Sequence, residues 1–433
     1  MQPAASRSAV RSSRRTAFMG IGIFGLAGIG VMWLWWTTAM RTPVVTIPSP
    51  VMPRPNAFDF YVKAGNTVVG YKQIGNAFGT KQKVVYSLAQ KEALIRPNIG
   101  VIDTVHQGFA YRYCNPPSRS FNTPFPYYAR FRGLSRLLAL QAQARAEREN
   151  WSGAADSCLD AVRLGADIPY GSPLIGDLVG IACQAIGRRQ MWSVVEHLNA
   201  AQSRSAISRL MSIMDRRLPY TDTLQEEKWA MQANLLEVFN DPKKAATLAD
   251  GKTDDPNVSQ KQSVLFYLFC SKTRIMENYT TYMDRSVQVA QQPYGLHLPS
   301  PPLPKDPINR ELLPVYEAAR LKNVENETQN GLLLVVLALH AFRMEHGQYP
   351  VSLNELAPVC LKKLPNDPFA VQGTFKYRVT GRSYVLYSVG PDGKDDGGMP
   401  IDNPKHPESS NPNARYFVEQ NSVGDVVAGK NTW

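Results

Sequence analysis

The sequence has little of what metal and redox sites are built from, with six histidines and five cysteines among 433 residues. No two cysteines form a C-x-x-C pair, which argues against a structural zinc site or a thioredoxin-like site. In an oxidising compartment one or two disulfides could form, and buried free thiols are the equally simple alternative. The cysteines are Cys114, Cys158, Cys183, Cys270 and Cys360.

Signatures of the common catalytic sites are also missing from the sequence. It contains no nucleophile elbow, zinc-protease helix, P-loop or dinucleotide fingerprint. The stretch HAFRMEH at 340–346 has two histidines, but their spacing fits neither H-E-x-x-H nor H-x-x-E-H. His340 lies beside an apolar stripe, so we expect a core or boundary histidine there. The sequence therefore predicts a protein that is not an enzyme.

Acidic residues are absent before Asp59, and the first charged residues of the chain are all basic. Four arginines precede an uncharged run from 16 to 40, namely Arg7, Arg11, Arg14 and Arg15. A run of that length can cross a hydrocarbon core of about 30 Å as a helix. Cytoplasmic arginines set the orientation of such a helix, and the tryptophans at 33, 35 and 36 favour the opposite interface.

This pattern predicts a cytoplasmic tail over 1–15 and a transmembrane anchor over 16–40. The chain would then be a single-pass protein of the cell inner membrane, with its bulk outside the cytoplasm, either periplasmic or at the cell surface. A cleaved signal peptide and a twin-arginine signal are the alternatives. The formal net charge is +12, but the basic residues after residue 40 are scattered among acids, so we do not expect nucleic-acid binding.

The fold class predicted from hydrophobic periodicity is mainly α, with a C-terminal α+β module. A proline-rich spacer over 41–55 leads into a helical domain over 56–292. Its expected helices cover 56–64, a tetratricopeptide-like pair that breaks at 150–153, and then 174–198, 203–217, 222–240 and 257–291. The segment 99–128 reads as irregular. A second proline-rich linker covers 293–307.

The C-terminal module spans 308–433. A long helix is expected over 308–346, with the apolar run of 331–342 buried against a sheet. Ser352 and Glu355 form a capping-box pattern, which predicts a short helix from 353 to about 363, with Val351 and Leu356 as its hydrophobic staple. The runs 375–379 and 383–389 alternate between apolar and polar residues and predict a β-hairpin. Asp367, in the NDPF stretch, reads as a turn residue that bonds local amides.

Directly after the second strand, the stretch SVGPDGKDDGG at 388–398 crowds Asp392, Asp395 and Asp396 among glycines. Calcium takes six to eight oxygen ligands at about 2.3–2.6 Å and tolerates irregular loops, so these carboxylates suit it. No histidine or cysteine stands beside them, which disfavours zinc, and the spacing is not that of an EF-hand. Solvated turn formers are the alternative, because Asp and Gly both favour tight bends.

The order of motifs in residues 321–433 resembles the globular domain of the type II secretion system major pseudopilin, the G subunit. The stretches that carry the resemblance are HGQYP, LPNDPF, SYVLYSVGPDGKDDGG and GDVV. The resemblance implies a calcium ion beneath the last loop, with Asp392 matching the family's turn and Asp425 its closing segment. Asp395, Asp396 and Asp402 are further candidate ligands. The chain departs from the family because its expected anchor carries no pseudopilin cleavage site and a helical domain is expected between anchor and head.

Fold and function are separate inferences. Taken together, these features predict a membrane-anchored extracytoplasmic scaffold or binding protein with a calcium-stabilised pseudopilin-like head. Its partners would be envelope or secretion proteins, and a homo-oligomer remains open. The alternative is a hydrolase of an envelope polymer, whose catalytic acids in the helical domain cannot be paired from the sequence.

Overall fold

The computed structural model describes residues 30, 33–34, 36–37, 40–78, 84–120, 123–241, 271–306, 309, 313, 316–403 and 414–431. Most of the anchor expected over 16–40, and all of the basic tail, lie outside these residues. Within them, no helix combines the length and the apolar character that crossing a membrane requires. The chain divides into two compact units. The larger contains residues 47–231, 283–302 and 314–433.

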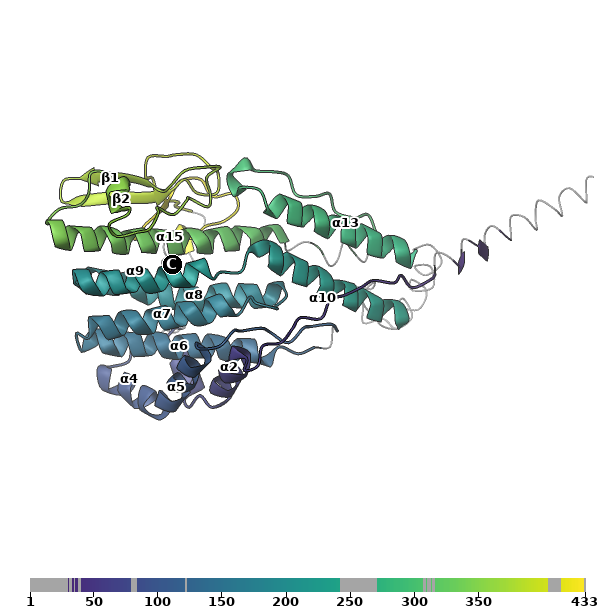
Figure 1. Cartoon of the computed structure of the whole chain (residues 1–433), viewed down its shortest axis with the longest axis horizontal. Coiled ribbons are helices and arrows are strands. Elements are labelled where there is room, and N and C mark those ends of the chain that lie inside the picture. The colour runs from purple at the N-terminus through teal and green to yellow at the C-terminus, as the bar shows by residue number, and fades with distance from the viewer. Residues whose placement is uncertain are drawn as a thin grey trace, which may run out of the picture. The chain divides into compact units, whose positions relative to one another are not determined.

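Among the described residues the fold is mainly helical with one small antiparallel sheet, as the sequence predicted (Figure 1). The sheet has the order β1-β2-β3, formed by Lys376–Thr380, Ser383–Ser388 and Val426–Val427. The helices are α2 (Ala57–Asn66), α3 (Tyr71–Asn76), α4 (Leu88–Ile95), α5 (Ile99–Gly108), α6 (Pro126–Glu147), α7 (Trp151–Asp167), α8 (Leu174–Val194), α9 (Ala200–Asp215), α10 (Tyr220–Asn240), α13 (Lys272–Ala290) and α15 (Tyr316–His346).

The first helices follow local signals closely. Helix α2 begins after Asn56, whose side chain accepts a hydrogen bond from the Phe58 amide at 3.1 Å and so caps the N-terminus of the helix. The prediction of irregular structure over 99–128 was wrong at both ends, because residues 99–108 form α5 and residues 126–128 belong to α6. Val101, Ile102 and Val105 share a helical face and are buried, whereas the proline-rich composition begins only further along the chain.

Helices α6 and α7 form the hairpin expected from the break at 150–153. The Asn150 side chain caps α7 by accepting from the Gly153 amide at 3.0 Å. Trp151 at the start of α7 stacks on His197, with ring centroids 3.8 Å apart. Helices α8 and α9 continue the array, and both lie within the ranges predicted for them, 174–198 and 203–217, to within a few residues.

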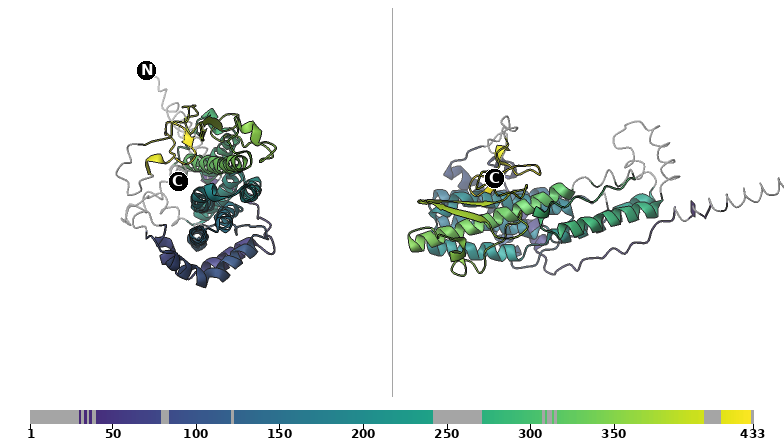
Figure 2. Two further views of the ribbon diagram at one scale, coloured as in Figure 1. Left: turned by 90° about the vertical axis from the view of Figure 1, so that its left-hand side faces the viewer. Right: turned by 90° about the horizontal axis from the view of Figure 1, so that it is seen from above.

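Helix α15 lies between the sheet and the helical array, packed against β2 on one side and against α8 and α9 on the other (Figures 1 and 2). Its residues from 326 to 342 are buried except for Glu327. The predicted burial against a sheet therefore accounts for only one side of the helix, and α8 and α9 cover the other. Helix α15 begins at Tyr316, whereas the sequence predicted one continuous helix from residue 308. Asn309 is helical, but Leu313 is not, because a residue before a proline is disfavoured in the α conformation.

A buried polar cluster joins α15 to α8. The Arg188 guanidinium donates to the side-chain oxygens of Asn326 at 2.9 Å and Asn330 at 2.8 Å. Both amide nitrogens in turn donate to Gln184. Burial lowers the pKa of Arg188 to about 10. Because each of these groups is buried and bonded to others in the cluster, the contact sets how the two helices dock.

The small module after α15 differs from expectation at one element. The capping box of Ser352 and Glu355 is present, but it starts a single 3₁₀ turn over Leu353–Leu356. The predicted helix to residue 363 is absent because Pro358 follows and disfavours helical backbone at Ala357, and the predicted staple does not form because Val351 is exposed. The β-hairpin is confirmed as β1 and β2, with Thr380 paired to Ser383.

The smaller unit contains the end of α10 and the start of α13, which pair side by side through local polar bonds. The Gln232 amide donates to the Thr280 hydroxyl at 3.0 Å. The Lys272 ammonium donates to the Phe239 carbonyl at 2.7 Å. Of the predicted helix over 257–291, residues 257–270 lie outside the described residues, and the remainder agrees with α13.

Candidate functional site

The acidic turn after β2 packs directly against the segment that precedes β3. Gly390 has a φ of +72°, and a Cβ at this position would lie 2.3 Å from the carbonyl oxygen of Gly424. Only glycine allows this approach together with the positive φ. The Asp425 amide donates to the Met399 carbonyl at 2.7 Å, which continues the contact along the chain. The backbone therefore places Asp425 beside the turn.

Asp425 is fully buried, with a relative exposure of 0%. Its carboxylate accepts from the Gly398 amide at 2.7 Å and from the Asp396 amide at 3.4 Å. Burial raises the pKa of Asp425 to about 6, and the nearby charges of Asp395 and Asp396 add to this rise, while the two amides oppose it. The carboxylate is therefore held in a site that would favour an added positive charge.

Two further carboxylates of the turn have unsatisfied oxygens. One carboxylate oxygen of Asp392 and one of Asp396 are buried without a hydrogen-bond donor from the described part of the chain. The other oxygen of Asp392 accepts from the Lys394 amide at 3.2 Å, which is a bond typical of an Asx turn. A buried carboxylate oxygen without a donor costs free energy, and a bound cation would remove that cost.

Asp395 is the better satisfied member of the turn. It accepts from the Tyr387 hydroxyl at 2.9 Å and from the Gly397 amide at 3.1 Å, and the Lys376 ammonium lies 3.5 Å away. Burial raises its pKa, but these three partners outweigh burial, so the net effect is a lowered pKa. Its charge is stabilised without a metal ion.

Asp402 has a partner of its own outside the turn. The Arg415 guanidinium engages both of its carboxylate oxygens, with Nε 2.7 Å from Oδ1. The hydrogen bond from Arg415 lowers the pKa of Asp402. The structure thus brings Asp425 to the acidic turn and assigns Asp402 to an ion pair.

The fit of this region to calcium is partial. The unsatisfied oxygens of Asp392 and Asp396 and the buried carboxylate of Asp425 are suitable hard ligands. However, nowhere among the residues that the structure describes do three or more His, Cys, Asp or Glu side chains gather closely enough to hold a metal ion. Calcium binding would therefore need backbone carbonyls, water and a rearrangement of these side chains to complete the coordination.

Asp367 is confirmed as a residue that bonds local amides. It is buried and accepts from the Phe369 amide at 3.0 Å, the Val389 amide at 3.0 Å and the Ser388 hydroxyl at 2.6 Å. Burial raises its pKa, and the hydrogen bonds from Ser388, Val389 and Phe369 reduce the effect. Asp367 thus ties the loop before β1 to the end of β2, directly before the acidic turn.

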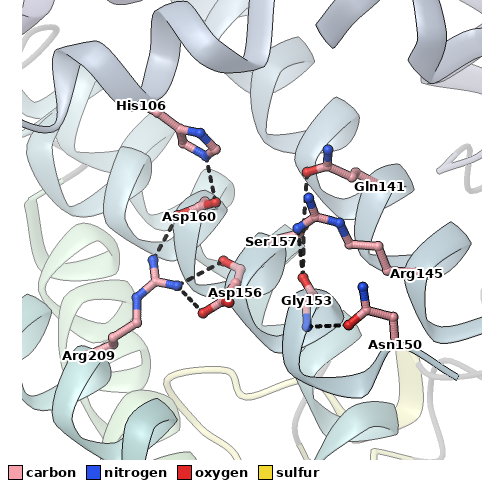
Figure 3. Close-up of polar contacts among 9 residues, drawn as sticks. All are labelled: His106, Gln141, Arg145, Asn150, Gly153, Asp156, Ser157, Asp160 and Arg209. Atoms are coloured by element: carbon pink, nitrogen blue, oxygen red, sulfur yellow. Dashed lines mark hydrogen bonds and ion pairs between the residues drawn. The ribbon is translucent and has the colours of Figure 1, made fainter.

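A second polar cluster lies within the helical array (Figure 3). The His106 Nε2 lies 2.8 Å from one oxygen of Asp160, and Arg209 donates to the other oxygen at 2.7 Å. Arg209 also bonds Asp156 at 2.5 Å. Asp156 and Asp160 are four residues apart on α7, which is the one signal in the sequence that they share a face.

The cluster continues around Ser157 on the same helix. Arg145 of α6 donates to the Ser157 hydroxyl at 2.8 Å and to the Gly153 carbonyl at 2.9 Å. The hydroxyl in turn donates to Gln141 at 2.9 Å. These bonds fix α6 against α7, and those of Asp160 connect α5, α7 and α9. Both carboxylates of the cluster, Asp156 and Asp160, are paired with Arg209, and Asp160 also contacts His106, so we assign the cluster a structural role.

His340 is confirmed as a core histidine. It is 2% exposed, and its Nε2 lies 2.7 Å from the Leu198 carbonyl oxygen. Four of the five cysteines are free thiols: Cys114, Cys158, Cys183 and Cys360. Cys270 lies outside the described residues.

Comparison with known proteins adds no family to this description. No protein-family model matches the chain, and neither the curated proteins nor the solved structures contain a significant match.

Proposed function

We propose that this chain is a membrane-tethered extracytoplasmic scaffold or binding protein, without catalytic activity, whose pseudopilin-like head is stabilised by Ca²⁺. The observation that supports the cation is the meeting of buried Asp425 with the turn that leaves oxygens of Asp392 and Asp396 unsatisfied. When bound, the ion would neutralise these carboxylates and join the turn to β3. Asp395 and Asp402 would stay in their present pairs.

The position of α15 supports a scaffold rather than a pilus subunit. In this chain the helix is covered by β2 on one side and by α8 and α9 on the other. Its docking is held by the buried cluster of Arg188. A helix that is covered by its own chain has no free face along this stretch for a bundle of identical subunits. The head and the array therefore act as one surface for envelope or secretion partners.

The cation is tested by thermal unfolding of the full chain in chelator, in Mg²⁺ and in Ca²⁺. A ligand at 100 times its dissociation constant stabilises the folded state by about 2.7 kcal/mol, so the unfolding midpoint should rise with Ca²⁺ concentration. The rise should disappear in Asp425→Asn and shrink in Asp392→Asn. Asp402→Asn is the matched control and should keep the rise.

Equal midpoints in chelator and Ca²⁺ would contradict the proposal, and so would an equal rise in all three variants. Either result would leave the turn as a solvated bend.

The tether over 16–40 is tested separately by membrane fractionation. The full chain should stay in the membrane pellet after alkaline carbonate extraction, because an apolar helix is released only by detergent. A chain that begins at residue 41 should be found in the soluble fraction. Release of the full chain by carbonate would contradict the anchor without bearing on the cation.

A further inference from the structure

The helical array contains a groove that none of the features above uses. It has a volume of about 710 Å³ and is lined by Pro50, Val51 and Pro53, by the segment 109–114 that follows α5, and by residues at the ends of α7 and α9. We call it the α5–α7 groove. Small-molecule sites typically occupy about 300–1,000 Å³ and combine apolar walls with a few convergent polar groups. The groove fits this description.

The charge of the groove is positive. Its one acidic residue is Asp167, and that carboxylate is already bonded to Arg163 at 3.0 and 3.1 Å and to the Tyr61 hydroxyl at 2.7 Å. Arg216 lies 3.8 Å from the same carboxylate and is half exposed. Arg112 is exposed and forms no ion pair with any residue that the structure describes. Two arginines therefore line the groove, and its one carboxylate is already bonded to Arg163 and to Tyr61.

The walls of the groove are aromatic and held in place. Tyr111 is exposed and stacks on Phe60, with ring centroids 5.1 Å apart and planes 22° from parallel. The Tyr170 hydroxyl donates to the backbone carbonyl of Arg216. Phe109 lies under the guanidinium of Arg163, 5.8 Å from ring centroid to Cζ. Flat rings offer stacking surfaces, and arginine offers paired donors that match carboxylate and phosphate oxygens.

We propose that the α5–α7 groove binds a small organic anion, in which a carboxylate or a phosphate is attached to a flat ring. Arg112 and Arg216 hold the anionic group, and the rings of Tyr111 and Tyr170 contact the flat body. The site lies on the helical array and uses none of the residues of the acidic turn, so it stands independently of the cation.

Fluorescence of anilinonaphthalene sulfonate, which joins a sulfonate to aromatic rings, provides the probe. The full chain is titrated in chelator, so that the result does not depend on Ca²⁺. We expect saturable binding that weakens about tenfold or more in Arg112→Gln/Arg216→Gln, because each lost guanidinium removes charge-assisted hydrogen bonds. The matched control, Arg132→Gln/Arg285→Gln, removes the same charge from exposed positions outside the groove and should leave binding unchanged.

A second variant tests the space of the groove without altering its charge. Ala110 is exposed and lines the groove, so Ala110→Trp should fill it and abolish dye binding while the far-UV circular dichroism stays the same. Benzoate and phenyl phosphate are then added as competitors. The one that displaces the dye at the lower concentration shows whether the groove prefers a carboxylate or a phosphate. Inorganic phosphate alone should compete weakly, because it has no ring.

Dye binding that survives both Ala110→Trp and the double arginine variant would overturn the proposal. The same conclusion would follow if neither benzoate nor phenyl phosphate displaced the dye.

Discussion

Replacing Asp177 with asparagine should make this protein more stable at neutral pH. Asp177 lies in the first turn of α8, is 4% exposed, and accepts a hydrogen bond from the Asn323 side chain at 2.6 Å. The ion pair of Arg217 and Glu327 lies nearby and acts on it with opposite signs. Burial dominates and raises the pKa of Asp177 from 3.8 to about 6. At neutral pH the folded chain must therefore hold a carboxylate that prefers water.

The sign of the pH dependence follows from proton binding. Between pH 3.8 and about 6 the folded state keeps a proton on Asp177 that the unfolded state has lost. Stability therefore falls as the pH rises through this window and stays at the lower level above it. The difference between the two pKa values corresponds to roughly 3 kcal/mol at neutral pH. An asparagine avoids this cost. Its amide hydrogens would destabilise the folded state by about 1 kcal/mol if they lack acceptors.

We therefore expect Asp177→Asn to raise the free energy of unfolding by about 1–3 kcal/mol at pH 7.5, and to change it little at pH 4. Chemical denaturation of the full chain at the two pH values measures both. Asp59→Asn is the matched control, because Asp59 also lies in the first turn of a helix but is exposed. Removing the Asp59 charge should lower the free energy of unfolding by about 0.3–1 kcal/mol at pH 7.5, because a negative charge at a helix N-terminus interacts favourably with the helix dipole. If Asp177→Asn destabilises the chain at pH 7.5, burial is not the dominant effect and the reasoning fails.

Three further changes probe the packing, each by unfolding of the full chain. His106→Gln should lower stability at pH 5.5 but not at pH 9, because the hydrogen bond between His106 and the buried Asp160 raises the pKa of the histidine. The loss should stay under about 1 kcal/mol, since the His106 side chain is 42% exposed. Arg188→Leu should cost about 1–3 kcal/mol by leaving the side-chain oxygens of Asn326 and Asn330 without a donor, and a neutral result would refute the docking role. Gly331→Val should cost about 1–3 kcal/mol, because its Cβ would lie 2.7 Å from the Phe375 ring, and Phe375→Leu should restore part of the loss.

Local signals in the sequence predicted most of the helices and the hairpin, because capping and periodicity act over a few residues. Asn56, Asn150 and the alternating strands are examples, and each forms the structure that its pattern indicates. Local reading failed where a proline outside the pattern decided the outcome. The turn at 353–356 stops before Pro358 although its capping box would start a longer helix.

Composition and short-range pattern alone determined that the chain is mainly helical, that a small antiparallel sheet follows the long helix, and that the turn after β2 is acidic. Only the tertiary structure decided which side chains meet. The contacts of His106 with Asp160, of Arg188 with Asn326, and of Asp425 with the turn join residues that lie 27 or more positions apart. Side-chain periodicity within one element carries no information about such pairs, because they form only when several helices pack against one another at fixed angles.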